Sequence, residues 1–350
     1  MKHFPSKRRG ELARGFAIGA GAATATLGAL AIWVARQARK AEGASPPSGK
    51  VLTVEGVPVH YLERGEGPPV VLLHGNMVRA EDFVASGLLV ELAKNHRVIA
   101  LDRPGYGYSE RPSDRLWTAE AQAALVKRTL EQLEVKKPTV LGHSWGTLVA
   151  LELALLSEVA VQRLVLISGY YFPAARVDVA LAAPPAIPLL GDILSYTVLP
   201  VAARITLNKT VKAMFAPKPV PANFLKVLDR EMLLRPKQIQ AAAQDAVFMI
   251  PGAARLRKRY REIESSVVIV AGDNDLVVDV DAHARKLHEE ISGSELIVLP
   301  GVGHMAHYAA PDQLAGAIDK EPPRPVANST EVDTFPDISR KLPPDVPWPR

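Results

Sequence analysis

A serine stands between two glycines where the sequence changes from a strand-like run to a helix-like run. Residues 139–141 form a short, largely apolar run that is typical of a strand. Residues 142–146 read Gly-His-Ser-Trp-Gly, and the stretch TLVALELALL follows. A sharp turn here would lift the Ser144 hydroxyl above a sheet, and a Cβ at either glycine would meet neighbouring backbone. The helix behind the turn would direct its positive N-terminus at developing negative charge. The pattern therefore predicts a nucleophilic serine.

A serine hydroxyl attacks well only when a base takes its proton, so the nine histidines are the candidates. His304 lies in the loop after the last predicted strand, 296–299, at the strand's carboxyl end. His307, three residues further on, is the alternative, and it can equally be a wall of the same loop. We predict that His304 is the base.

A base of this kind needs a carboxylate that orients the imidazole and stabilises the imidazolium. The apolar run 267–270 leads into Ala-Gly-Asp-Asn-Asp, which places Asp273 and Asp275 at the end of another strand. Asp275 has room to turn back over the sheet, whereas Asp273 is better placed to bond its own turn. Asp275 is the predicted acid, and Asp273 is the alternative.

Acyl transfer also needs N–H donors for the oxyanion. Gly75, between His74 and Asn76, follows an apolar strand and lets the backbone swing so that the N–H of Asn76 points inward. The N–H of Trp145, directly after the serine, is the second predicted donor. A plain tight turn at His74-Gly75 is the alternative interpretation.

The elements that must position these residues follow a regular pattern. Residues 51–54 and 57–63 alternate around Glu55-Gly56 and predict a hairpin. Buried apolar runs then recur, and helical stretches such as 119–134, which Thr118 can cap, separate several of them. A hairpin followed by alternating strands and helices predicts an α/β fold with a mostly parallel sheet flanked by helices. We assign 51–169 and 263–320 to this core.

A long interval, 170–262, interrupts the alternation and is rich in proline. It predicts short helices broken by turns, and its position suits a lid over a site. Packing decoration is the alternative. Three aromatic residues just after the strand, Tyr170, Tyr171 and Phe172, are predicted to line a substrate pocket, with the alternative that they are core of the lid. The same holds further on for Phe215, Phe248 and Met249.

The N-terminal region predicts a membrane anchor within residues 1–40. Residues 15–35 hold no charge for 21 positions, a helical length of about 30 Å, and cations flank them on both sides. Five cations before the run against three after it favour a catalytic domain outside the cytoplasm. A cleaved signal, and hence secretion, is the main alternative, and a peripheral helix is the other. Residues 41–50 are expected to be a flexible linker.

Composition limits the other possibilities. The chain is 48% hydrophobic and 23% charged, which indicates a folded core. It has no cysteine, so thiolate chemistry and disulfides are excluded, and no metal-ligand spacing or cofactor motif is evident. The net charge of +5 comes from the first 50 residues, whose net is +7, so no nucleic-acid partner is expected. The proline-rich stretch 321–350 predicts an extended or disordered tail.

Together these motifs resemble the α/β-hydrolase family over about residues 51–320. The order Ser144, Asp275, His304 is that family's order of nucleophile, acid and base. His74-Gly75 and the segment 102–109, Asp-Arg-Pro-Gly-Tyr-Gly-Tyr-Ser, are also similar to motifs common in it. The resemblance implies the α/β-hydrolase fold and a serine-nucleophile, esterase-like member with a lid.

Related classes are separated by their residues. Haloalkane dehalogenases and epoxide hydrolases use aspartate where this chain has Ser144, because an alkylated serine would be an ether that water does not release. Proline iminopeptidases carry His-Gly-Gly-Pro-Gly where this chain has His-Gly-Asn-Met-Val at 74–78, and the meta-cleavage product hydrolases have a glycine-rich turn that is missing here.

We therefore expect a serine hydrolase that cleaves a small or medium apolar carboxylic ester through an acyl-enzyme. The alternatives are a cofactor-free haloperoxidase-like enzyme and a non-catalytic binding protein of the same fold.

Overall fold

An eight-stranded sheet runs through the part of the chain that the computed structural model describes, which comprises residues 6–156, 159–174, 184–187 and 189–320. Side chains are described from Gly19 onward. The predicted tail at 321–350 lies outside the described residues.

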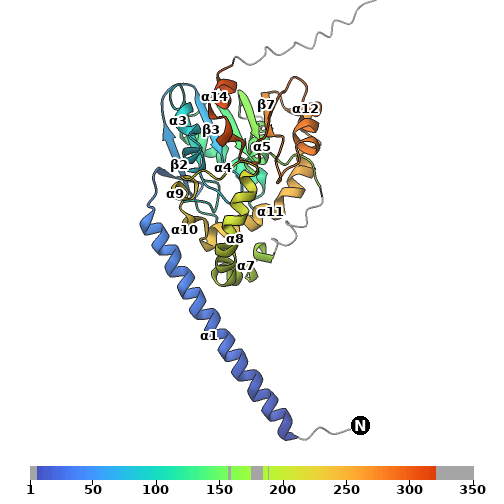
Figure 1. The fold of residues 1–350 in the computed structure, drawn as a ribbon. Helices are drawn as coiled ribbons and strands as arrows, with labels where there is room; N and C mark the ends of the chain where they lie inside the picture. The colour runs from blue at the N-terminus through green and yellow to red at the C-terminus, as the bar shows by residue number, and fades with distance from the viewer. Residues whose placement is uncertain (1–5, 157–158, 175–183, 188, 321–350) are drawn as a thin grey trace, which may run out of the picture. The chain divides into compact units, whose positions relative to one another are not determined.

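The strands lie in the order β1-β2-β4-β3-β5-β6-β7-β8 (Figure 1). β2 pairs antiparallel with β1 and β4, and all other neighbours are parallel, so the predicted mostly parallel sheet is confirmed. In chain order the strands are β1 (Lys50–Val54), β2 (Val57–Arg64), β3 (Pro69–Leu73), β4 (Arg97–Leu101), β5 (Thr139–His143), β6 (Arg163–Ile167), β7 (Ser266–Gly272) and β8 (Glu295–Leu299).

The first two strands form the predicted hairpin. Val54 pairs with Val57, and the two turn residues Glu55 and Gly56 have φ values of 49° and 79°. Left-handed backbone at both positions matches the right-handed twist of the strands on either side. The Glu-Gly pair therefore sets the register of this edge of the sheet.

The central strands are apolar along their whole length because both faces of the sheet are covered. In β3, Val71 and Leu73 pack into one core, while Val70 and Leu72 pack into the core on the opposite face. Helices α4 (Ala119–Gln132) and α5 (Gly146–Ala154) belong to the first core. The second core takes in α2 (Asp82–Ala85), α3 (Leu88–Leu92) and α14 (Pro311–Asp319).

Helix α4 begins as expected at Thr118, whose hydroxyl accepts a hydrogen bond from the N–H of Ala121 at 3.2 Å. The short elements after β7 are η3 (Asp281–Arg285) and α12 (Lys286–Glu290), and α13 (Ala306–Ala309) follows β8.

The described part of the interval between β6 and β7 is largely helical, and two of its helices, α8 and α11, are longer than the predicted short helices. The described elements are η1 (Pro184–Ala186), α7 (Leu190–Tyr196), α8 (Val198–Phe215), α9 (Phe224–Val227), α10 (Arg230–Leu233), α11 (Pro236–Leu256) and η2 (Tyr260–Glu262). Proline does not divide α11, because Pro236 is in its first turn, where a missing N–H costs nothing, and Pro251 is accommodated inside the helix.

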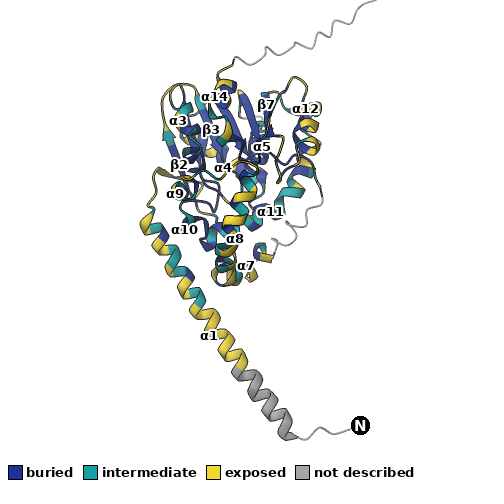
Figure 2. Ribbon diagram, viewed as in Figure 1, coloured by how far each residue is buried: buried dark blue, intermediate teal, exposed yellow. Residues whose placement is uncertain are grey.

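Helix α1 (Ser6–Ala44) contains the uncharged segment 15–35 and extends four residues into the predicted linker 41–50. Its side chains are exposed from residue 19 to 29 and partly buried further on, with Val34 and Ala41 buried (Figure 2). Arg235, directly before α11, forms an ion pair with Glu42 at 2.8 Å. The C-terminal part of α1 is therefore packed against the helices between β6 and β7.

Within the described residues, no single helix combines the length and the apolar composition of a membrane span. The bent pair α7 and α8, with 59° between the two helices, is the one described combination that has both.

Candidate active site

Ser144 occupies a tight turn between β5 and α5. Its φ is 51°, a left-handed conformation that is costly for a residue with a side chain and that marks strained functional turns. A Cβ on Gly146 would lie 2.2 Å from the carbonyl oxygen of Leu73, and one on Gly142 would lie 2.7 Å from that of Gly146. The predicted need for glycine on both sides of the serine is confirmed, since each glycine touches backbone that cannot move aside.

His304 reaches the serine from the loop after β8. Its Nε2 lies 2.8 Å from Ser144 Oγ, and the residue is 3% exposed. The backbone carbonyl of His304 accepts a hydrogen bond from Nε2 of His143 at 3.2 Å, which anchors the loop behind the ring. This geometry suits proton transfer from the serine hydroxyl to an imidazole.

Asp275 lies on the other side of the imidazole. Its Oδ2 is 2.8 Å from Nδ1 of His304, and its Oδ1 accepts hydrogen bonds from the N–H groups of Val277 and Val278 at 2.7 and 2.9 Å. Three donors thus hold one carboxylate, which orients His304 with Nε2 toward the serine.

Asp273 makes different contacts. Its Oδ1 accepts hydrogen bonds from the side chain of Asn274 at 2.6 Å and from the N–H of Gly301 at 2.7 Å. These donors lower the pKa of the Asp273 carboxyl below its usual value, with the Asn274 bond as the largest cause. Asp273 therefore ties the loop after β7 to the loop after β8 and leaves His304 to Asp275.

His307 also lies away from the serine. Its Nε2 is 2.9 Å from Oδ2 of the buried Asp82, and its ring is tilted by 53° against that of His143, with centroids 4.3 Å apart. Asp82, His143 and His307 could bring three metal-ligand atoms within 4.8 Å of one another. Both oxygens of Asp82 already bond protein groups, however, because Oδ1 accepts from the hydroxyl of Tyr308 at 2.7 Å. Among the described residues, Nδ1 of His143 and Nδ1 of His307 have no hydrogen-bond partner, so the cluster behind His304 is only partly satisfied.

The predicted oxyanion residues, Asn76 and Trp145, line the same cavity as Ser144 and His304. Trp145 directly precedes α5, so its N–H belongs to a helix end whose first N–H groups lack partners within the helix. Asn76 follows the carboxyl end of β3, and the next residue, Met77, has φ 65°. This turn brings Asn76 to the edge of the sheet where Ser144 stands.

The cavity has a volume of about 800 Å³ and a mainly apolar wall. No Asp, Glu, Lys or Arg is among the described residues that line it. Apolar side chains of the interval between β6 and β7 contribute a large share of the wall, among them Leu194, Leu199, Leu207, Leu233, Ile239 and Met249.

Of the three aromatic residues predicted to contact substrate, Tyr170 lines this cavity, whereas Tyr171 and Phe172 do not. Tyr171 is fully buried in the core, and its carbonyl accepts a hydrogen bond from Tyr260. Phe172 packs edge-on against Tyr260 with ring centroids 5.7 Å apart. Of the three further candidates in the interval, only Met249 lines it. Proximity in sequence to a strand end did not show which way each ring points.

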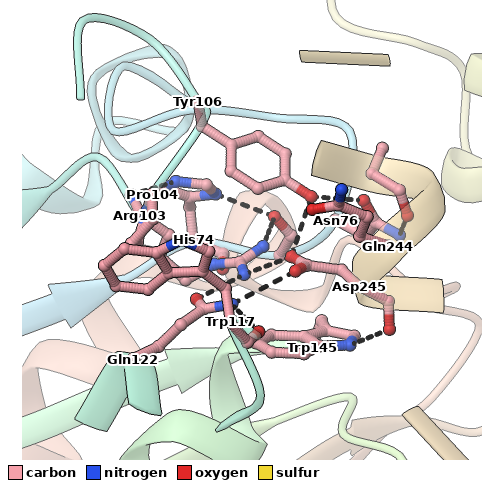
Figure 3. A network of polar contacts seen from close by, with 12 residues as sticks. His74, Asn76, Arg103, Pro104, Tyr106, Trp117, Gln122, Trp145, Gln244 and Asp245 are labelled. Atoms are coloured by element: carbon pink, nitrogen blue, oxygen red, sulfur yellow. Dashed lines mark hydrogen bonds and ion pairs between the residues drawn. The ribbon is translucent and has the colours of Figure 1, made fainter. Parts of the chain in front are cut away.

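A buried polar network behind the cavity was not anticipated (Figure 3). Asp245 of α11 is 0% exposed and forms ion pairs with Arg103 at 2.5 Å and Arg111 at 3.1 Å. Arg103 also donates to the carbonyls of His74 and Gly75, each at 2.9 Å. One sequence signal was available, because Asp245 is the only acidic residue of α11.

Burial in this network also sets the state of His74. Burial, followed by the nearby Arg103 charge, lowers the pKa of His74 to about 4. The neutral ring donates from Nδ1 to the carbonyl of Gly75 at 2.8 Å and accepts at Nε2 from the N–H of Arg103 at 3.0 Å. His74 therefore holds the turn before Asn76 as an uncharged bridge.

Comparisons with known proteins agree with this architecture. The chain is 27% identical over 294 residues to an uncharacterised protein of Mycobacterium tuberculosis, covering 81% of this chain and 84% of the relative. It is 34% identical over 132 residues to a 2-hydroxymuconate semialdehyde hydrolase of Pseudomonas sp., covering 37% and 47% of the two chains. An esterase from Exiguobacterium antarcticum has a similar structure, with a TM-score of 0.63, 22% identity, and coverage of 77% of this chain and 97% of the esterase.

The family description "alpha/beta hydrolase fold" matches residues 68–311, which span β3 to the first turn of α14 and include Ser144, Asp275 and His304. The matched range contains the parallel strands, the turn at the serine and the interval after β6. Because this match covers more than half of the chain, the chain belongs to the α/β-hydrolase family.

Proposed function

We propose that the chain is a serine hydrolase that cleaves a small or medium apolar carboxylic ester through an acyl-enzyme intermediate. The observation that carries this proposal is the continuous chain of hydrogen bonds from Ser144 Oγ to His304 Nε2 and from His304 Nδ1 to Asp275, each 2.8 Å long. These hydrogen bonds end at a cavity whose described lining residues carry no charge, which favours an uncharged ester.

The geometry supports an ordinary two-step acyl transfer. As Ser144 Oγ bonds to the ester carbonyl carbon, its proton passes to His304 Nε2, and Asp275 stabilises the imidazolium. The N–H groups of Asn76 and Trp145 donate hydrogen bonds to the negative carbonyl oxygen. His304 then protonates the alcohol oxygen as the carbon–oxygen bond breaks, which leaves the acyl group on Ser144. Water, deprotonated by His304, attacks the acyl carbon and releases the acid and the free serine.

A second candidate substrate class, a semialdehyde that carries a carboxylate, follows from the partial similarity to a 2-hydroxymuconate semialdehyde hydrolase. A muconate carries a carboxylate, which a site would hold with Lys, Arg or several N–H donors. The described lining of this cavity includes neither Lys nor Arg, and this favours the neutral ester.

The decisive test is a panel of aryl esters of increasing acyl length with the full chain and with Ser144→Ala. Loss of Ser144 is expected to lower kcat by a factor on the order of 10⁶, because nothing else in the site supplies the nucleophile. Asp275→Asn is expected to lower kcat by roughly 10⁴, because the imidazole loses its orientation. The matched variant Asp273→Asn is expected to cost less than about tenfold, since Asp273 contacts only the loops.

Ser168→Ala serves as the control for Ser144, because Ser168 ends the neighbouring strand with a similar φ of 49°. A serine-directed phosphonate should label the wild-type chain and Ser168→Ala, but not Ser144→Ala. Ester hydrolysis that survives in Ser144→Ala, or a folded wild-type chain that hydrolyses no ester in the panel, would refute the proposed function.

We also propose that residues 15–35 attach the chain to a membrane, with the catalytic part outside the cytoplasm. The uncharged segment and the cations around it support this. Helices α7 and α8, beside the end of α1, also expose large apolar side chains, including Ile193 at 57% and Ile205 at 79%. Exposed apolar side chains in such number mark a surface that meets a membrane or another protein.

A further inference from the structure

The carboxylate of Asp245 lies where helix α11 meets the turn after β3 and the turn after β4. Its Oδ2 bonds Arg103 at 2.5 Å and the hydroxyl of Tyr106 at 2.9 Å. Its Oδ1 bonds Arg111 and Gln122, each at 3.1 Å. A fully buried carboxylate with four donors has one geometry available to it, because moving it would leave charges unpaired in an apolar surrounding.

Asp245 holds Trp145 through its backbone. The indole Nε1 of Trp145 donates to the carbonyl oxygen of Asp245 at 2.7 Å. The guanidinium of Arg103 lies over the Trp145 ring, 4.6 Å from its centroid. The Trp145 side chain is therefore fixed at its edge by the backbone carbonyl of Asp245 and at its face by Arg103, the ion-pair partner of Asp245.

Asn76 and Asp245 share the Tyr106 hydroxyl. It lies 2.7 Å from Oδ1 of Asn76 and 2.9 Å from Oδ2 of Asp245, and its single hydrogen is donated to one of these acceptors at a time. Burial, and next the Asp245 charge, raises the pKa of Tyr106 well above its usual value, so the phenol stays protonated. Asn76 also donates from Nδ2 to the carbonyl of Ala242, one turn before Asp245 on α11, at 3.0 Å.

These contacts converge on Asn76 and Trp145, the two residues proposed above to donate N–H groups to the oxyanion. We propose that Asp245 is a positioning residue for the oxyanion hole: its carboxylate, through Tyr106, and its backbone carbonyl hold Asn76 and Trp145 in the places from which their N–H groups meet the oxyanion. The contribution of such donors depends on their being held in place before the reaction, and loss of one donor costs a factor of about 10²–10³ in kcat. This inference rests on the proposed function, because the oxyanion forms only if Ser144 attacks a carbonyl.

The test uses the full chain, an aryl ester and an alkyl trifluoromethyl ketone, which a serine nucleophile converts to a tetrahedral oxyanion. Tyr106→Phe removes only the hydroxyl between Asn76 and Asp245. We expect kcat to fall about tenfold, KM to stay within about twofold, and Ki for the ketone to rise by the same factor as kcat/KM falls. Asp245→Asn is expected to lower kcat on the order of 10²-fold. The double variant should lose little more than Asp245→Asn alone, because both changes break the same link.

Two control variants remove comparable contacts elsewhere. Tyr260→Phe deletes a buried hydroxyl that donates to the carbonyl of Tyr171 at 2.5 Å, and Arg255→Gln removes the ion pairs of α11 with Glu120 and Glu152. Both should keep the wild-type kcat and Ki, even if their melting temperatures fall.

The outcomes separate this inference from the function itself. If Ser144→Ala is inactive but Tyr106→Phe and Asp245→Asn keep the wild-type kcat and Ki, Asp245 has no positioning role. A fall in kcat with an unchanged Ki for the ketone would also overturn it, because the oxyanion would then be held as before. If Asp245→Asn does not fold, Tyr106→Phe, which leaves every charge in place, decides the question. Esterase activity that survives in Ser144→Ala would instead refute the proposed function.

Discussion

At the scale of single residues, the site combines groups that touch the reacting atoms with buried polar groups that hold them. Ser144, His304 and Asp275 form the hydrogen-bonded chain, while His74, Arg103 and Asp245 lie behind it with at most 1% of each residue exposed. Such groups are retained only where each finds partners, because an unpaired buried charge costs several kcal/mol. The buried polar residues behind the site therefore depend on their exact partners as much as the residues that face the cavity do.

Acid stability is one consequence at this scale. His74 has a folded-state pKa of about 4, below the ordinary value of 6.5, so between these values the unfolded chain binds more protons than the folded chain. The contribution of His74 to the free energy of unfolding is therefore completely present above about pH 6.5. It is lost as the pH drops toward 4. Burial also lowers the pKa of His143, which acts in the same direction.

We expect His74→Gln to flatten part of this pH dependence, because glutamine does not titrate. Urea unfolding of the wild-type chain and the variant, at pH 7.5 and at pH 5, measures the effect. The wild-type chain should lose more stability between the two pH values than the variant, by on the order of 1 kcal/mol. Equal losses would show that His74 is not a source of the acid sensitivity.

At the scale of elements, the turn from β5 to α5 is the most constrained feature. It places Ser144 in left-handed backbone, and it brings Gly146 against the end of β3. The strain is sustained because β5 is hydrogen-bonded on both sides within the sheet and because α5 is buried along almost its whole length. A nucleophile on such a turn is exposed to the cavity while its backbone stays fixed.

Gly146→Ala is expected to destabilise the protein by more than about 3 kcal/mol, because its Cβ would lie 2.2 Å from the Leu73 carbonyl oxygen and 2.6 Å from that of His74. Gly252→Ala in α11 is the matched change, since the nearest heavy atom there is Leu148 Cδ1 at 3.8 Å. Alanine in that helix should stabilise the protein by about 0.5–1 kcal/mol. Thermal unfolding of the two variants checks both signs, and a stable, active Gly146→Ala would show that the turn tolerates a side chain.

At the scale of the whole molecule, the parallel strands gather the site at one edge of the sheet. Asn76, Ser144, Asp275 and His304 each follow the carboxyl end of a different strand, namely β3, β5, β7 and β8. Parallel pairing puts these ends side by side, so residues 160 positions apart, Ser144 and His304, come within hydrogen-bond distance. The helices between β6 and β7 supply much of the described wall of the cavity around them.

The proposed membrane attachment is a prediction at this scale. In cells that express the full chain, we expect it in the membrane pellet after a carbonate wash. Leu27→Arg with Leu30→Arg should move it to the soluble fraction, since an arginine costs about 2.5–3.5 kcal/mol where its helix lies in the middle of the bilayer. Val51→Arg, on the exposed edge strand β1, is the matched control. A wild-type chain that washes off the membrane, or a double arginine variant that stays on it, would contradict the proposal.

The sequence by itself determined the features that depend on neighbouring residues. The hairpin at Glu55-Gly56, the cap at Thr118 and the serine turn between two glycines each follow from local backbone preferences and short-range sterics. The apolar runs likewise predicted a sheet covered on both faces, because only such strands lack polar positions. The order of Ser144, Asp275 and His304 along the chain then matched a known arrangement of strand ends.

Only the tertiary structure decided contacts between segments far apart in sequence. It turned His307 toward Asp82, Tyr171 and Phe172 into the core, and Asp245 of α11 onto Arg103. The physical reason is that a side chain's direction and its burial depend on which elements pack around it, and local residue patterns carry no record of those neighbours. Buried charges depend most on such packing, because each is stable only beside partners that the rest of the fold supplies.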